Sequence, residues 1–130
     1  QVLCAFDASF GAGLLDALAQ VIVDQQTTLL IAYDSEYPEP LHSKRNTPDC
    51  GGVALLLTPN KTARSLAKIT VSPSAASALC MSASELEALR SNIPALRSLP
   101  LLQMLARGES GSLCLDYLSP MQLSVDLQLC

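Results

Sequence analysis

The sequence predicts one α/β domain built on a mixed sheet with helical layers. Two apolar, strand-like runs, residues 2–6 and 28–33, are joined by a helical stretch at 11–25. A helical crossover between neighbouring strands requires them to pair in parallel. The end of the chain, residues 112–130, has instead the pattern of a hairpin. At 130 residues and 49% hydrophobic, the chain is long and apolar enough for one core.

The N-terminal elements follow from apolar spacing and from small residues. Residues 2–6 form a continuous apolar run, as expected of a strand buried on both faces. In residues 11–25, Leu14, Leu18 and Val21 recur at helical spacing. The small residues from Gly11 to Gly13 predict that this helix begins in close contact with another backbone. The strand at 28–33 leads into an irregular loop.

Further along the chain, proline and glycine mark the boundaries of the predicted elements. Ser84 and Glu87 have the spacing of a capping box, so a helix is expected to begin there. Pro94 interrupts it, and a second helical stretch ends at Gly108. The segments expected after residue 33 are a loop at 34–50, strands at 51–58 and 68–72, a helical segment at 84–107, and hairpin strands at 113–118 and 122–129.

Composition limits the classes of function. The charged fraction is 15%, against about 25% in typical soluble domains, which suggests that a partner covers part of the surface. The net charge of −4 and the scattered basic residues disfavour nucleic acid as a partner. Five cysteines without a CxxC pair indicate reduced thiols and a cytoplasmic location. No metal or cofactor motif occurs, and no apolar run approaches the length of a membrane span.

The turn between the first strand and the first helix has the layout of a nucleophile elbow. Ser9 is one candidate nucleophile, but Asp7 stands where such elbows carry a glycine, and no histidine follows His42 to act as a late base. Cys4 is the second candidate, although a thiol inside a buried strand is expected to be unreactive. A small serine or cysteine hydrolase or acyltransferase therefore stays as an alternative function.

A third interpretation rests on family resemblance. The turn around Ala8, the Leu-Leu-Ile-Ala-Tyr strand ending at Tyr33, the Gly51-Gly52 strand and the Ala-Lys-Ile of residues 67–69 resemble the N-terminal half of ketosynthases, which have the thiolase fold. The Tyr37-Pro-Glu-Pro-Leu segment is similar to the small ketosynthase-like chain-length factors of bacterial aryl polyene (xanthomonadin-type) pigment clusters. The resemblance covers about residues 2–72.

The resemblance implies a noncatalytic subunit with part of the N-terminal ketosynthase half. Counting back from the matching strands places Ala8 where the family has its nucleophilic cysteine, so no catalytic residue is expected. The implied partners are a complete β-ketoacyl synthase, whose acyl tunnel the subunit shapes, an acyl carrier protein bound through that synthase, and a separate N-terminal fragment. A plain structural fragment is a further alternative. The tunnel or interface candidates are Ala8, Ser9, Phe10, Tyr33 and Tyr37.

Two further polar features are expected to lie on the protein surface and to take no part in a functional site. His42 lies in the 34–50 loop, at a position unrelated to the two histidines that ketosynthases need. Lys44 and Arg45 are the only adjacent basic pair and are expected to be a solvated loop tip, so the acidic carrier protein would dock on the partner.

Overall fold

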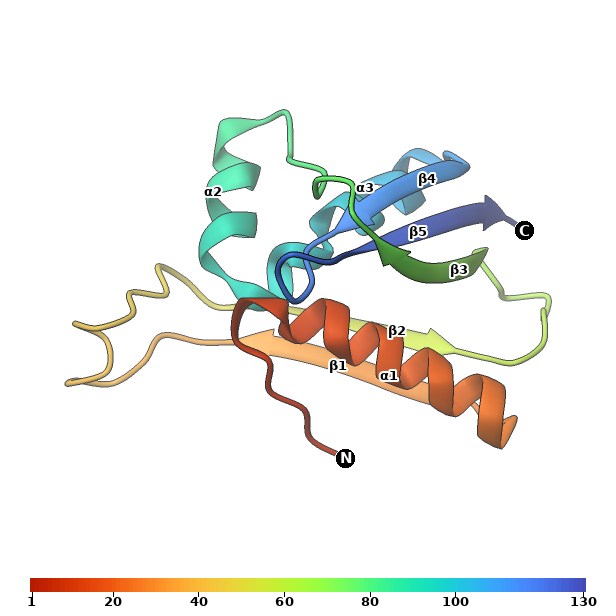
Figure 1. Cartoon of the computed structure of the whole chain (residues 1–130), viewed down its shortest axis with the longest axis horizontal. Coiled ribbons are helices and arrows are strands. Elements are labelled where there is room, and N and C mark those ends of the chain that lie inside the picture. The colour runs from red at the N-terminus through yellow and green to blue at the C-terminus, as the bar shows by residue number, and fades with distance from the viewer.

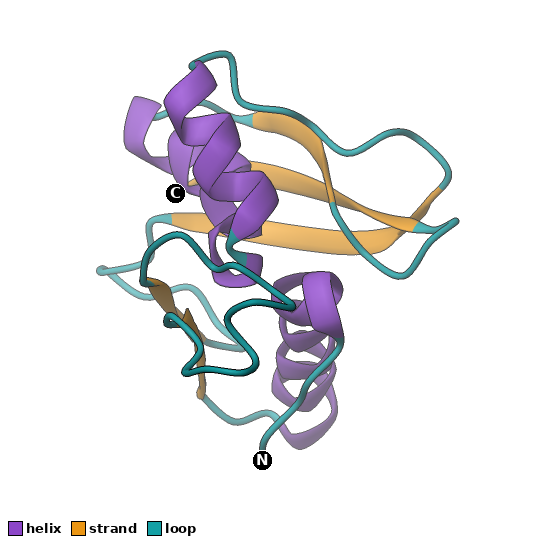
Figure 2. Ribbon diagram, turned by 90° about the vertical axis from the view of Figure 1, so that its left-hand side faces the viewer, coloured by secondary structure: helices purple, strands orange, loops and turns teal.

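The computed structural model describes all residues, 1–130, and contains two small antiparallel sheets and three α-helices. Figure 1 shows the elements in chain order, and Figure 2 shows helices lying between and beside the two sheets. The elements are η1 (Phe6–Ala8), α1 (Ser9–Asp24), β1 (Thr28–Asp34), β2 (Gly51–Leu57), β3 (Ala67–Ser74), α2 (Ser84–Asn92), η2 (Pro94–Ser98), α3 (Leu99–Arg107), β4 (Gly111–Leu115) and β5 (Gln122–Leu129).

The α/β class is therefore present, but the expected mixed sheet is replaced by two antiparallel sheets. β1 pairs with β2 along their whole length, from Thr28 opposite Leu57 to Asp34 opposite Gly51. The second sheet has the order β3-β5-β4. Its β4 and β5 belong to the segment predicted as a hairpin, and they pair antiparallel.

The prediction of a strand at residues 2–6 is wrong. Residues 1–5 have no regular secondary structure, and the chain then enters the short 3-10 helix η1, where Phe6 has a positive φ of 54°. A strand exists only where a neighbour accepts its hydrogen bonds, and β1 pairs with β2 alone. The predicted parallel pairing of the first two strands consequently does not form, and Val2 and Phe6 are exposed.

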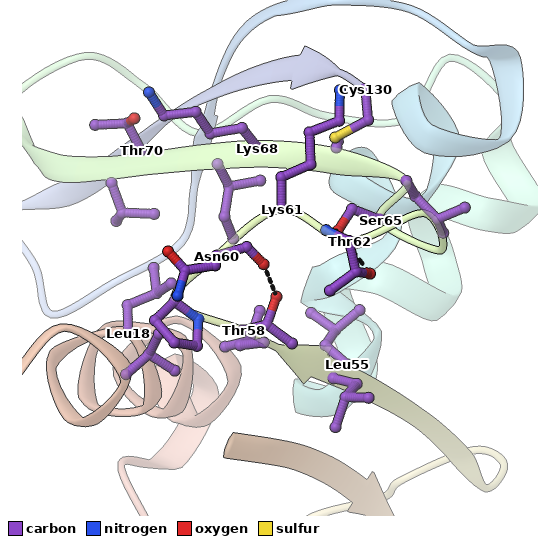
Figure 3. Close-up of a pocket in the computed structure, with 18 of the residues that line it drawn as sticks. Leu18, Leu55, Thr58, Asn60, Lys61, Thr62, Ser65, Lys68, Thr70 and Cys130 are labelled. Atoms are coloured by element: carbon purple, nitrogen blue, oxygen red, sulfur yellow. Dashed lines mark hydrogen bonds between the residues drawn. The ribbon is translucent and has the colours of Figure 1, made fainter. Parts of the chain in front are cut away.

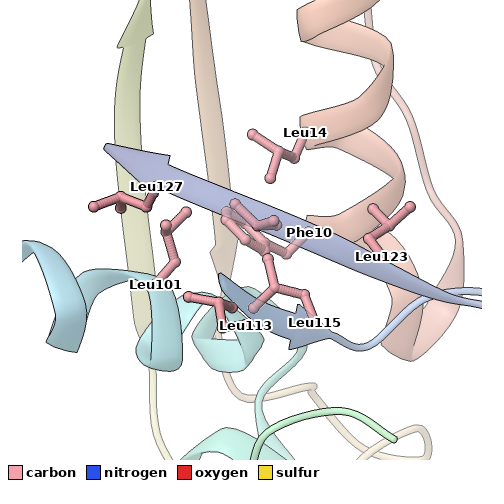
Figure 4. Packing of buried hydrophobic residues seen from close by; sticks show 8 residues of the cluster. Phe10, Leu14, Leu101, Leu113, Leu115, Leu123 and Leu127 are labelled. Carbon is pink, nitrogen blue, oxygen red and sulfur yellow. The ribbon is translucent and has the colours of Figure 1, made fainter. Parts of the chain in front are cut away.

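One hydrophobic core joins α1 to the second sheet. Phe10 and Leu14 on the inner face of α1 are fully buried, and side chains of α3, β4 and β5 surround them (Figure 4). The partly buried face of the β1–β2 ribbon packs against the same cluster. The other members of the buried cluster are Leu101, Leu113, Leu115, Leu123, Val125 and Leu127.

The first turn of α1 makes the close backbone contact that its glycines predict. A Cβ atom added at Gly11 would lie 2.4 Å from the backbone carbonyl oxygen of Asp116, which follows β4. A Cβ at Gly13 would meet only the end of the Leu30 side chain, at 3.2 Å. Gly11 thus lets α1 lie directly against the β4–β5 connection.

This contact predicts opposite effects for the same substitution at two positions of one helix. Ala normally stabilises a helix by about 1 kcal/mol relative to Gly. Gly11→Ala is expected instead to lower the free energy of unfolding, by about 1–2 kcal/mol net, because a backbone oxygen cannot move aside as a side chain can. Gly13→Ala is the control and is expected to be neutral or stabilising. Chemical denaturation of both variants measures this, and equal stabilities would contradict the close approach.

The helical segment between β3 and β4 starts and ends where the sequence predicts. α2 begins at Ser84, although neither side chain of the expected capping box bonds as such a box requires: Glu87 accepts a hydrogen bond from the Met81 N–H instead, at 2.7 Å. Pro94 starts η2, and α3 ends at Gly108, whose φ is 65° and whose N–H donates to carbonyls of the last turn. Glycine suits this left-handed position.

One helical stretch is long and apolar enough to cross a membrane by length and composition alone. It covers Phe6–Asp24, which includes α1, whereas the sequence was expected to contain no apolar run near the length of a membrane span. Core helices pass the same test, and Phe10 and Leu14 of this stretch lie in the core.

Candidate functional site

The short helix η1 and the first two residues of α1 carry three of the five predicted site residues. Ala8 and Phe10 are buried, and Ser9 is half-buried. The Ser9 hydroxyl donates to the Phe6 carbonyl at 2.6 Å and accepts from the Ala5 N–H at 3.0 Å. Its hydrogen bonds therefore go to the backbone of the turn itself, and it makes none to a histidine or carboxylate that could act as a base.

The carboxylate next to this site, that of Asp7, pairs with Arg45 and not with Ser9. The Asp7 carboxylate forms an ion pair with Arg45, whose guanidinium also lies over the Phe6 ring, 5.3 Å from its centroid. Arg45 belongs to the irregular 34–50 loop, so its two contacts tie the loop to the turn. Lys44 is exposed and His42 is half-buried. The expectation of a freely solvated basic pair thus holds for Lys44 and fails for Arg45.

Cys4 is exposed, which corrects the expectation that a strand would bury it. It precedes η1 in the segment without regular structure. All five cysteines are free thiols, and no group of three or more His, Cys, Asp and Glu side chains is placed to hold a metal ion.

Tyr33 and Tyr37 lie away from the core. Tyr33 is 78% exposed on the outer face of β1, and Tyr37 is partly exposed in the loop that follows. The carboxyl end of β1 and the start of α1 lie at the same end of the molecule (Figure 1). Tyr33 thus lies at the same end of the fold as the start of α1. The two side chains do not share a site, because Phe10 is buried in the core and Tyr33 is exposed.

The outer face of the β1–β2 ribbon is entirely apolar and exposed. In the antiparallel register, Leu29 lies opposite Leu56, Ile31 opposite Ala54, and Tyr33 opposite Gly52. We call these six residues the ribbon face. The other face of the same ribbon packs on the core, so the ribbon has apolar side chains on both sides. The sequence predicts such strands to be buried on both faces, whereas here one face is left to solvent.

A second apolar feature is a groove of about 890 Å³ between β2 and β3 (Figure 3). We call it the β2–β3 groove. Side chains of α1 and α3 line it, with Leu18 and Leu105 among them, and residues of the loop at 58–66 line it as well. Sequence analysis missed the groove because its walls come from four elements, each of which has an ordinary apolar pattern.

Sequence analysis also missed a half-buried cluster of charges. Arg90 of α2 forms ion pairs with Glu87, at 2.6 Å, and with Asp116 after β4, and Arg97 of η2 binds the other oxygen of Asp116 at 2.7 Å. Arg90 holds the pKa of Glu87 down to about 2, with help from the Met81 N–H. Glu87 and Asp116 in turn raise the pKa of Arg90. The spacing of 26 residues between Arg90 and Asp116 gives no sequence signal.

Comparison with models of protein families, with curated proteins and with solved structures finds no match for this chain. Its own residues are therefore the basis for any functional argument.

Proposed function

We propose that this chain is a noncatalytic, ketosynthase-like subunit that pairs with a complete β-ketoacyl synthase and shapes the acyl tunnel of that partner. In this proposal the chain is part of a thiolase-like half and acts as a chain-length factor of aryl polyene type. The observation that carries the proposal is the ribbon face, because six exposed apolar residues on a two-stranded ribbon need a partner.

The chemistry of the turn supports a noncatalytic role. Ala8, which the family resemblance aligns with the nucleophile, has no nucleophilic atom. Ser9 makes two hydrogen bonds to the backbone and has no base. A subunit without its own nucleophile would act through the partner, which would also bind the acyl carrier protein.

The ribbon face has the composition of an interface core. It contains leucine, isoleucine and tyrosine and has no charged residue, as in the centres of stable protein–protein contacts. Charged residues are also few in the whole chain, at 15%. Tyr33, at one end of the face, is a large side chain of the kind that often anchors such contacts.

The test is to replace Ile31, which lies at the centre of the ribbon face and is 60% exposed. Ile31→Lys is expected to weaken binding to the complete ketosynthase of the same organism by about 2 kcal/mol, roughly thirtyfold in Kd, because an unpaired charge would be buried in the contact. Val23→Lys is the control, since Val23 is exposed on α1 outside the ribbon face. Size-exclusion chromatography and titration calorimetry of the purified pair measure the effect.

Three outcomes would contradict the proposal. The first is equal binding by both variants. The second is the absence of any complex with the ketosynthase while the chain pairs with itself through Ile31. The third is an acyl adduct on Cys4 or Ser9 after incubation with acyl-CoA, detected by intact mass, which would favour the acyltransferase alternative.

A further inference from the structure

The β2–β3 groove differs from the ribbon face in its charge. Its lining includes Lys61, Arg64 and Lys68, which are three of the eight basic residues of the chain. None of the twelve acidic side chains lines it, although the chain has a net charge of −4. We call these three the groove cations. None of them takes part in an ion pair, whereas Arg45, Arg90 and Arg97 do.

The groove cations lie beside an apolar wall rather than on an open polar surface. Figure 3 shows Lys61 and Lys68 on the side of the groove opposite Leu18 and Leu55. The apolar wall is continuous with the core, because Leu18 and Leu55 also pack against the buried cluster. A molecule in the groove would thus meet hydrocarbon along its length and positive charge at one side.

The loop that carries Lys61 and Arg64 is held in shape by its own hydroxyls. The Thr58 hydroxyl donates to the Asn60 carbonyl at 2.8 Å, and the Ser65 hydroxyl accepts from the Thr62 N–H at 2.9 Å. The two cations therefore project from a loop with internal hydrogen bonds, and binding an anion would require less ordering of the backbone.

The lining also restricts the class of ligand. No Phe, Tyr or Trp is present, so the groove offers no ring on which a base or other planar group could stack. Its volume of about 890 Å³ falls within the range of about 300–1,000 Å³ that small-molecule sites have. A flexible aliphatic chain with one compact anionic group fits these conditions better than a nucleotide does.

We propose that the β2–β3 groove binds a long-chain fatty carboxylate, with the aliphatic chain along α1 and β2 and the carboxylate at Lys61 and Arg64. The site belongs to this chain alone and does not depend on the ketosynthase partner. Ala54 and Leu56 belong both to the groove lining and to the ribbon face, so the two surfaces adjoin. The residues chosen for the tests do not overlap: Ile31 does not line the groove, and Lys61, Arg64 and Ile22 are not part of the ribbon face, so the two proposals fail separately.

The charge of the ligand is tested by displacement of a fluorescent fatty acid, 11-(dansylamino)undecanoic acid, from the full chain. Dodecanoate is expected to displace the probe at about tenfold lower concentration than 1-dodecanol, and added salt is expected to narrow that difference. Lys61→Glu/Arg64→Glu is expected to remove the preference for the carboxylate. Lys44→Glu/Arg107→Glu is the control, because it changes the net charge by the same amount at residues that do not line the groove. This variant is expected to keep the preference for the carboxylate.

The apolar wall is tested with two neighbouring residues of α1. Ile22 lines the groove and is 68% exposed, while Val23 is 78% exposed and does not line it, so both substitutions spare the core. Ile22→Glu is expected to weaken probe binding about tenfold, and Val23→Glu to leave it unchanged. Equal displacement by dodecanoate and dodecanol, equal effects of the two double variants, or no binding of the probe would each overturn the proposal.

Discussion

Replacing Phe10 with alanine is expected to lower the free energy of unfolding by about 3–5 kcal/mol, the largest effect among the substitutions proposed for this chain. The ring is fully buried and lies at the centre of the main cluster, between α1 and the β4–β5 hairpin. Its removal loses the transfer free energy of the ring and leaves a cavity that Leu14 and Leu123 cannot fill without moving α1. Denaturant titration followed by circular dichroism measures the loss.

Phe6→Ala is the matched control, because Phe6 is the only other phenylalanine and is exposed. Its ring contacts the guanidinium of Arg45, and a contact of this kind at the surface contributes about 0.5–1 kcal/mol. Equal losses for both variants would mean that Phe10 does not hold the core together.

The same variant separates a core role for Phe10 from the tunnel role that the family resemblance implies. A ring that lines an acyl tunnel could be removed at little cost in stability, and products would lengthen. The buried position of Phe10 favours the core role. A stable Phe10→Ala subunit whose ketosynthase complex makes longer products would restore the tunnel role and would shift attention away from Tyr33 and Tyr37.

Local patterns predicted most of the secondary structure well, because those patterns depend on residues a few positions apart. The helix over residues 11–25 appears as α1, two residues earlier at its start, and the strand at 28–33 appears as β1. Gly108 ends α3 as predicted. In each case the sequence signal, a periodic apolar face or a glycine in the left-handed conformation, lies within the element that it predicts.

The pairing of strands was predicted less well, because it depends on which segments meet. Residues 2–6 have the composition of a buried strand and lie in no sheet, because β1 has only β2 beside it. The parallel crossover inferred from these residues fails for the same reason. Apolar content on both faces of β1 and β2 was recognised in the sequence, but whether the second face is covered depends on partners outside the chain.

The features proposed as sites were the hardest to predict. Ser9 and Ala8 were located by a local motif, and the structure adds only where the hydrogen bonds of Ser9 go. The β2–β3 groove combines residues from positions 15 to 130, and its significance lies in the absence of acidic side chains. Neither property is visible in a window of ten or twenty residues.

Removing the positive charge at the centre of the half-buried cluster is expected to cost about 3 kcal/mol, the second largest effect. Arg90 is almost completely buried and binds both Glu87 and Asp116, so Arg90→Met leaves Glu87 without its ion pair and Asp116 with Arg97 alone. Arg107→Met is the control, because Arg107 is exposed and forms no ion pair; it is expected to change stability by less than about 0.5 kcal/mol.

The loss in Arg90→Met is also expected to depend on pH. The pKa of Glu87 is about 2 in the folded chain and near its ordinary 4.5 when unfolded, so its ionised form stabilises the fold fully above about pH 4.5. As the pH falls from about 4.5 towards 2, protonation removes that contribution from the native protein. The variant has already lost most of it, because Arg90 is the main cause of the low pKa. The gap in stability between native protein and variant should therefore be widest near pH 7 and narrow in acid. A gap that stays constant down to pH 2 would mean that Arg90 stabilises the fold by packing rather than by its pairing with Glu87.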